Sequence, residues 1–121
     1  MKELLYIFIG GGLGSVARYL CGIGARLIFP VPFPWGTFLV NVIGCLFIGI
    51  LYGFADRHRL APALMLFLAT GFCGGFTTFS TFSYEMLLLL RTGHFWLFLL
   101  YAVASFALGL GAAYAGYRLC G

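Results

Sequence analysis

At the centre of this chain lies Gly71-Phe72-Cys73-Gly74-Gly75-Phe76-Thr77-Thr78-Phe79-Ser80-Thr81-Phe82, inside an apolar stretch that runs from Pro62 to Arg91. As one straight helix this stretch would measure about 45 Å, whereas the hydrocarbon core of a bilayer is roughly 30 Å thick. Its glycine and threonine pairs are poor helix formers, and hydroxyls compete for backbone hydrogen bonds. Non-helical backbone survives at membrane depth only where protein or water satisfies it. The segment therefore predicts a helix broken mid-membrane, which is a common setting for ion or substrate sites.

The composition excludes a soluble domain. Of 121 residues, 63% are hydrophobic and only 8% are charged, whereas a soluble domain carries about 25% charged residues. No run of Lys and Arg is present, so nucleic acid is not an expected partner. The cysteines lack CxxC spacing, which favours buried apolar thiols over metal or disulfide chemistry; they are Cys21, Cys45, Cys73 and Cys120.

Four apolar spans are predicted, at about residues 4–28, 35–54, 62–91 and 95–118, and they form one domain over residues 1–121. The breaks are the proline-rich residues 30–34, the charged residues 56–59 and residues 91–94. An even number of spans places both termini on one side. The side of the termini would hold only slightly more Lys and Arg residues than the other side. Because this difference sets the orientation, the small bias predicts insertion in both orientations.

The first span combines glycines with an arginine. Gly10, Gly14, Arg18 and Gly22 recur every four residues and share a helix face. Small residues on one face favour a close helix–helix contact. Arg18 lies too deep for a simple end residue. It is interpreted either as an anchor to backbone carbonyls at a subunit contact or as a group that attracts an anion directly.

Polar residues in the other three spans complete the candidate site. In the second span, Asn41 either bonds across helices or directs its amide into a pore. In the third span, Phe79 and Phe82 face one way, and a row of hydroxyls leads toward Glu85. The alternative is a purely structural role, in which the rings pack and the hydroxyls hydrogen-bond to the backbone of their own helix. Thr77, Thr81 and Glu85 form this row, flanked by Ser80 and Tyr84, and the fourth span adds Tyr101 and Ser105.

These motifs resemble the CrcB/Fluc family of fluoride channels over essentially the whole chain. The resemblance rests on the glycine-rich first span ending at Arg18-Tyr19, on residues 36–44, on residues 71–82, and on Tyr101 with Ser105. It implies a fluoride-selective passive channel, not an enzyme, that exports F⁻ across a bacterial inner membrane and lowers cytoplasmic fluoride. It also implies an antiparallel, dual-topology homodimer with two pores at the interface and a central structural Na⁺.

The resemblance also assigns roles to individual residues. Backbone carbonyls of Gly74 and Thr77 would hold the sodium ion. The fluoride path would include Asn41, Phe79, Phe82, Ser80, Thr81, Glu85, Tyr101 and Ser105. Two other functions are weighed against it. A proton-coupled drug exporter would need a carboxylate within the first span, where Glu3 lies at the very start. A non-transporting helper would need a larger complex.

Overall fold

The computed structural model describes residues 1–29 and 33–120, and every regular element in this part of the chain is helical. Four helical segments are long and apolar enough to cross a membrane: α1 (Lys2–Ile28), α2 (Trp35–Arg57), Pro62–Arg91 and α6 (Phe95–Cys120). The prediction of an all-α protein with four apolar spans is confirmed, and the protein is a multi-pass membrane protein. Residues 30–32 of the predicted proline-rich break lie outside the described residues.

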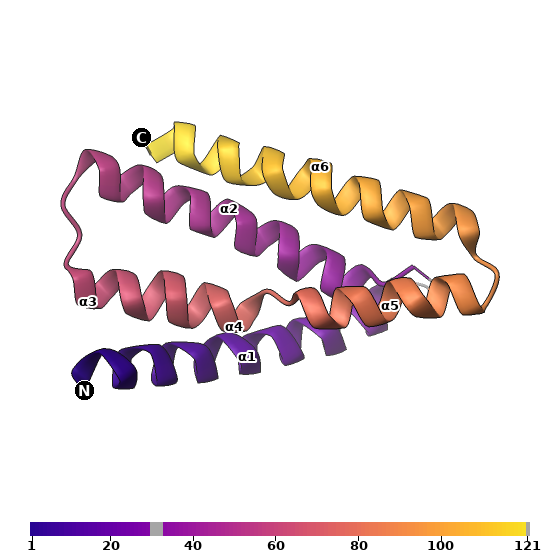
Figure 1. Ribbon diagram of the computed structural model, residues 1–121, viewed down its shortest axis with the longest axis horizontal. Helices are drawn as coiled ribbons and strands as arrows, with labels where there is room; N and C mark the ends of the chain where they lie inside the picture. Colours follow the sequence, from indigo (N-terminus) through magenta and orange to yellow (C-terminus); the bar gives the residue numbers. More distant parts are fainter. Residues whose placement is uncertain (30–32, 121) are drawn as a thin grey trace.

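The third segment is divided into four elements. They are α3 (Pro62–Met65), the π-helical η1 (Leu66–Cys73), α4 (Gly74–Phe76) and α5 (Phe79–Arg91). Thr77 and Thr78 join α4 to α5 in extended conformation, with φ −91° and ψ 158° at Thr77 and φ −152° and ψ 125° at Thr78. Figure 1 shows this joint as a thin connection between two coils.

Both termini lie at the same end of the bundle, together with the α2–α3 connection (Figure 1). The α5–α6 turn lies at the other end, where Gly93 takes the positive φ of 80° that favours glycine. Helix α6 runs beside α2, and α1 runs beside η1 and α4. The chain therefore packs as two helix pairs.

Small residues permit the close approach within each pair. A Cβ on Gly14 would overlap the carbonyl oxygen of Phe72, and a Cβ on Gly49 would overlap that of Ala113. Without hydrophobic driving force inside lipid, helices associate through such close packing. The predicted helix contact along the glycine face of the first span is confirmed at Gly10 and Gly14, which pack on η1 and α4.

The core is small and aromatic on one side of the joint. Tyr101 is fully buried there with Phe38 and Leu89. Large apolar side chains point outward from the bundle, among them Phe8, Trp96 and Phe106. An outer surface of this kind suits a hydrocarbon surrounding rather than water.

Candidate functional site

The side chain of Asn41 supports the extended joint between α4 and α5. Its Oδ1 accepts from the backbone N–H of Thr78 at 2.9 Å, and its Nδ2 donates to the carbonyl of the same residue at 3.1 Å. Backbone groups inside a membrane protein need such partners wherever the helix stops. Asn41 on α2 thus replaces the neighbours that a continuous third helix would supply.

Thr78 also starts helix α5. Its Oγ1 accepts from the backbone N–H of Thr81 at 3.2 Å, which is the bond of an N-cap residue. The same oxygen lies 3.3 Å from Oγ of Ser80. Ser80 and Thr81, which belong to the predicted polar residues of the third span, are therefore both hydrogen-bonded to the cap residue Thr78.

Three backbone carbonyls near the joint have unusual hydrogen-bonding partners. Those of Gly74 and Thr77 lack the amide partner of a regular helix, and that of Gly75 accepts from a side chain. In a continuous helix, the amides of Thr78 and Thr81 would bond the carbonyls of Gly74 and Thr77. Both amides instead donate to side chains, as described above. The Gly75 carbonyl accepts from Nε of Arg18 at 3.0 Å. Arg18 is therefore anchored to a backbone carbonyl of its own chain, and the subunit contact expected there stays a prediction.

A cavity of about 640 Å³, here called the central cavity, lies beside this joint. Asn41, Phe79 and Phe82 line it, as does Ser105 from α6. The Oγ of Ser105 is the only buried side-chain polar atom in the described part of the chain that lacks a hydrogen-bond partner. An unsatisfied buried hydroxyl in a roomy cavity indicates a place for a polar ligand or water. The remaining lining residues are Gly44, Cys45, Ile48, Ala69, Cys73, Gly74, Thr77, Thr78, Met86, Ala102 and Phe106.

The two phenylalanines are placed differently within this cavity. Their ring centroids lie 5.8 Å apart. Phe82 packs against Tyr101 with centroids 4.8 Å apart, whereas the Phe79 side chain is 78% exposed in the single chain. Phe82 is therefore held by its own subunit, and nothing in the described part of this chain covers most of Phe79.

The carboxylate of Glu85, on α5, joins this helix to both α6 and α2. The hydroxyl of Tyr101 donates to Glu85 Oε1 at 2.8 Å, and that of Thr37 donates to Oε2 at 2.9 Å. Both oxygens of Glu85 are thus occupied by hydroxyl donors from α6 and α2. Such a half-buried carboxylate inside a transmembrane bundle is a candidate functional residue by default.

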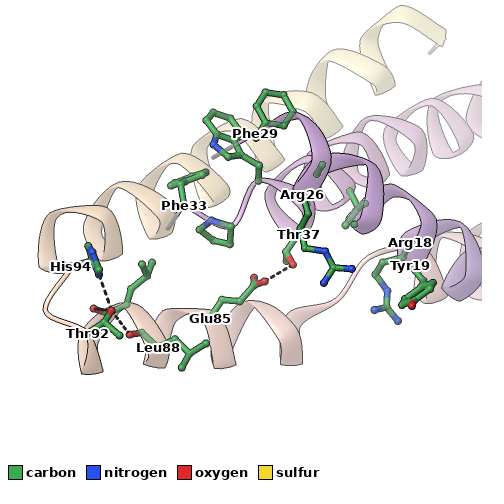
Figure 2. A pocket seen from close by; sticks show the side chains of 17 residues that line it. Arg18, Tyr19, Arg26, Phe29, Phe33, Thr37, Glu85, Leu88, Thr92 and His94 are labelled. Atoms are coloured by element: carbon green, nitrogen blue, oxygen red, sulfur yellow. Dashed lines mark hydrogen bonds between the residues drawn. The ribbon is translucent and has the colours of Figure 1, made fainter. Parts of the chain in front are cut away.

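Thr37 and Glu85 open onto another cavity, of about 530 Å³, here called the side cavity (Figure 2). It lies between α1, the start of α2, and α5. Arg18 and Arg26 line it from α1, and Thr92 and His94 line it beyond the end of α5. Figure 2 shows the Thr37–Glu85 bond between α2 and α5, with the two guanidinium groups on the α1 side.

The predicted site residues thus fall into two groups. One surrounds the central cavity: Asn41, Gly74, Thr77, Phe79, Phe82 and Ser105. Glu85 and Arg18 line the side cavity, Tyr101 lies between the two cavities, and Ser80 and Thr81 stay beside the Thr78 cap.

Sequence reasoning missed Thr78 and Thr37 as site residues. A threonine three residues before Thr81, at the start of a helix, is an N-cap signal that identifies Thr78. Thr37 carried no comparable signal, because its partner Glu85 comes from another span.

Fold and site together define a four-span membrane protein with an interrupted third segment and, beside the interruption, a mostly apolar cavity that contains a few polar side chains. A family profile described as CrcB-like protein, Camphor Resistance (CrcB), matches residues 5–117. The chain belongs to this family, as the sequence resemblance predicted.

Curated relatives extend over nearly the whole chain. A protein of Bacteroides fragilis is 54% identical over 119 residues, which cover 96% of this chain and 94% of the relative. Relatives from Phocaeicola vulgatus and Leptospira interrogans are 49% and 47% identical, with 91% and 95% of this chain covered and 91% of each relative. All three are named fluoride-specific ion channel FluC.

Proposed function

We propose that this protein is a passive, fluoride-selective channel that exports F⁻ and so lowers cytoplasmic fluoride. The observation that carries the proposal is the central cavity, where the unpartnered Ser105 hydroxyl lies with Asn41, Phe79 and Phe82. The names of the relatives, which are ion channels and not enzymes, support it. The host membrane in this proposal is the bacterial inner membrane.

The donors of the central cavity suit a small anion that must move. The Ser105 hydroxyl can donate one hydrogen bond, and the Asn41 amide retains one N–H beyond its bond to Thr78. The edges of Phe79 and Phe82 carry the positive end of the ring quadrupole. Several weak donors allow an ion to enter and to leave, whereas a full ion pair in a low-dielectric site would trap it. Once a second copy narrows the site, fixed donors would favour the smallest and most strongly accepting halide.

Two copies of the chain complete the pores in this proposal. The largely exposed ring of Phe79 lines the central cavity, and the Thr77–Thr78 joint lies midway along the third span. A second copy in antiparallel orientation would cover this surface and enclose the interrupted backbone at membrane depth. The proposed dual-topology homodimer contains two such pores at its interface.

A structural Na⁺ at the dimer centre fits the carbonyls of Gly74 and Thr77. Gly74 and Thr77 both line the central cavity. The amides that would bond their carbonyls in a continuous helix, those of Thr78 and Thr81, donate to side chains instead. Carbonyl oxygens are ligands that hard cations prefer. The two copies would together offer four such carbonyls. When bound, the ion supplies positive charge near the anion path. No cluster of three His, Cys, Asp or Glu side chains that could hold a metal occurs in residues 1–29 and 33–120.

The proposed function is tested by a flux measurement on the purified protein alone. Liposomes that contain the protein are loaded with potassium fluoride or chloride, and release is followed with ion-selective electrodes after valinomycin is added. We expect release of fluoride but not chloride, without a pH gradient. Release that requires a proton gradient would favour the drug-exporter alternative, and no release at all would favour a helper protein.

A further inference from the structure

We propose that the side cavity is the outer mouth of the fluoride path and that Arg26 raises the local concentration of the anion there. The inference rests on the proposed function and adds a residue to it. Arg26 lies in the last turn of α1, lines the cavity and is exposed. It has no hydrogen-bond or ion-pair partner among the residues that the structure describes. Its charge therefore faces the cavity and is not held in an ion pair with a described carboxylate.

The charges that line the side cavity are unequal. Arg18 and Arg26 contribute two cations, and Glu85 is the single carboxylate in the lining. Both oxygens of Glu85 accept hydroxyl bonds, from Thr37 and Tyr101. Arg18 uses Nε for the Gly75 carbonyl, which leaves its two terminal nitrogens without a described partner. The cavity is thus electropositive, and low-dielectric walls focus such a field.

A series of contacts joins this cavity to the central cavity. Thr37 and Glu85 lie in its wall (Figure 2), Glu85 accepts from Tyr101, and Tyr101 packs on Phe82. Phe82 in turn lines the central cavity. An anion that leaves the central cavity along these groups therefore arrives among Thr37, Arg18 and Arg26. Arg26 belongs to the last turn of α1, where its side chain lines the cavity and is exposed.

Arg26 has a structural alternative, because a cation in the last turn also stabilises a helix through the macrodipole. A phosphate of a lipid headgroup would be a second anion for the same charge. The three roles differ in what they affect. Capture of fluoride makes flux sensitive to ionic strength, the macrodipole affects stability alone, and a headgroup makes the effect depend on lipid composition.

The test compares the variants Arg26→Gln, Arg26→Lys and Arg91→Gln in liposomes. Arg91 ends α5 and is exposed outside the side cavity, so it is a matched control for an interfacial arginine. Initial fluoride fluxes are measured in both directions at ionic strengths of ~10 mM and about 1 M, where the Debye length falls from roughly 30 Å to 3 Å. We expect Arg26→Gln to slow flux about two- to fivefold at low ionic strength and to match wild type at high ionic strength. Arg26→Lys should stay near wild type at both.

Each other outcome overturns a distinct statement. Suppose that the wild-type protein conducts fluoride and that Arg26→Gln and Arg91→Gln change the flux equally at low ionic strength. This result overturns the capture role and leaves the proposed function intact. An effect that is independent of salt, or that accompanies a lower unfolding temperature, overturns it in favour of a structural role. An effect seen in vesicles with phosphatidylglycerol but not in pure phosphatidylcholine overturns it in favour of a bound headgroup. A wild-type protein without fluoride flux overturns the proposed function itself.

Discussion

Asn41 and Thr78 form a paired hydrogen bond in which one side-chain amide serves both backbone groups of one residue. The two residues come from different spans, 37 positions apart. The bond has two consequences. It satisfies backbone where the third segment is extended, and it fixes the Asn41 amide against the central cavity. Stability and ion binding are thus joined at one side chain.

The first prediction concerns this pair. We expect Asn41→Ala to leave the N–H and carbonyl of Thr78 unpaired, at about 1–3 kcal/mol for each group. Thermal unfolding in detergent should show a clearly lower midpoint, and fluoride flux should fall severalfold, because the central cavity also loses the amide donor of Asn41. Ile43→Ala, at an exposed position on the same helix, is the control. Equal stability of the two variants would contradict the role of Asn41 at the joint.

The sequence alone was enough to predict the four spans, the helix contact at Gly10 and Gly14, and the family. These depend on local composition and on spacing within one helix. Partners from different spans were beyond it. Asn41 was left between two interpretations, and the structure places it both against the Thr78 backbone and in the cavity wall. Glu85 was assigned to a row on its own helix, although its donors come from α2 and α6. No periodicity within one span reports such contacts.

The second prediction separates conduction from packing at the two phenylalanines. Phe79→Ile removes a ring edge from the cavity but little buried contact, because Phe79 is 78% exposed in the single chain. Phe82→Ile also loses the packing on Tyr101. We expect both variants to lose fluoride flux by more than about tenfold, whereas the unfolding midpoint falls further in Phe82→Ile, which also loses packing within its own subunit.

Leu87→Ile is the matched control, because Leu87 is exposed on the same helix and lines neither cavity. Flux from liposomes and unfolding in detergent are measured on all three variants. Flux losses of the same size in Leu87→Ile would contradict the assignment of the two rings to the ion path.

The third prediction tests the close contact between α1 and the third segment. A methyl group on Gly14 would overlap the Phe72 carbonyl oxygen and lie 2.9 Å from the backbone nitrogen of Phe76. The backbone cannot move aside as a flexible side chain would, so we expect Gly14→Ala to destabilise the fold by about 1–3 kcal/mol. Gly12→Ala meets no atom within 4 Å and should be neutral or slightly stabilising, since alanine favours a helix. Similar unfolding midpoints for the two variants would contradict a backbone-to-backbone contact at Gly14.

The last prediction uses a residue at which stability and function should change independently. The Ser105 hydroxyl is buried without a partner, and a buried polar group in that state lowers stability. Ser105→Ala removes it without changing the shape of the cavity much. We therefore expect the unfolding midpoint to stay equal or rise slightly, by at most about 1 kcal/mol. Fluoride flux should fall severalfold, because a donor to the anion is lost.

Ser15→Ala is the control for this variant, since Ser15 is exposed on α1 and lines neither cavity. Both variants lose one hydroxyl, so any difference in flux reports position and not composition. Unchanged flux in Ser105→Ala would remove the hydroxyl from the ion path. A lower midpoint would mean that Ser105 has a structural partner in the assembled protein, such as a residue of a second copy. An intact fold with slower fluoride release is the one result that only a ligand-facing hydroxyl explains.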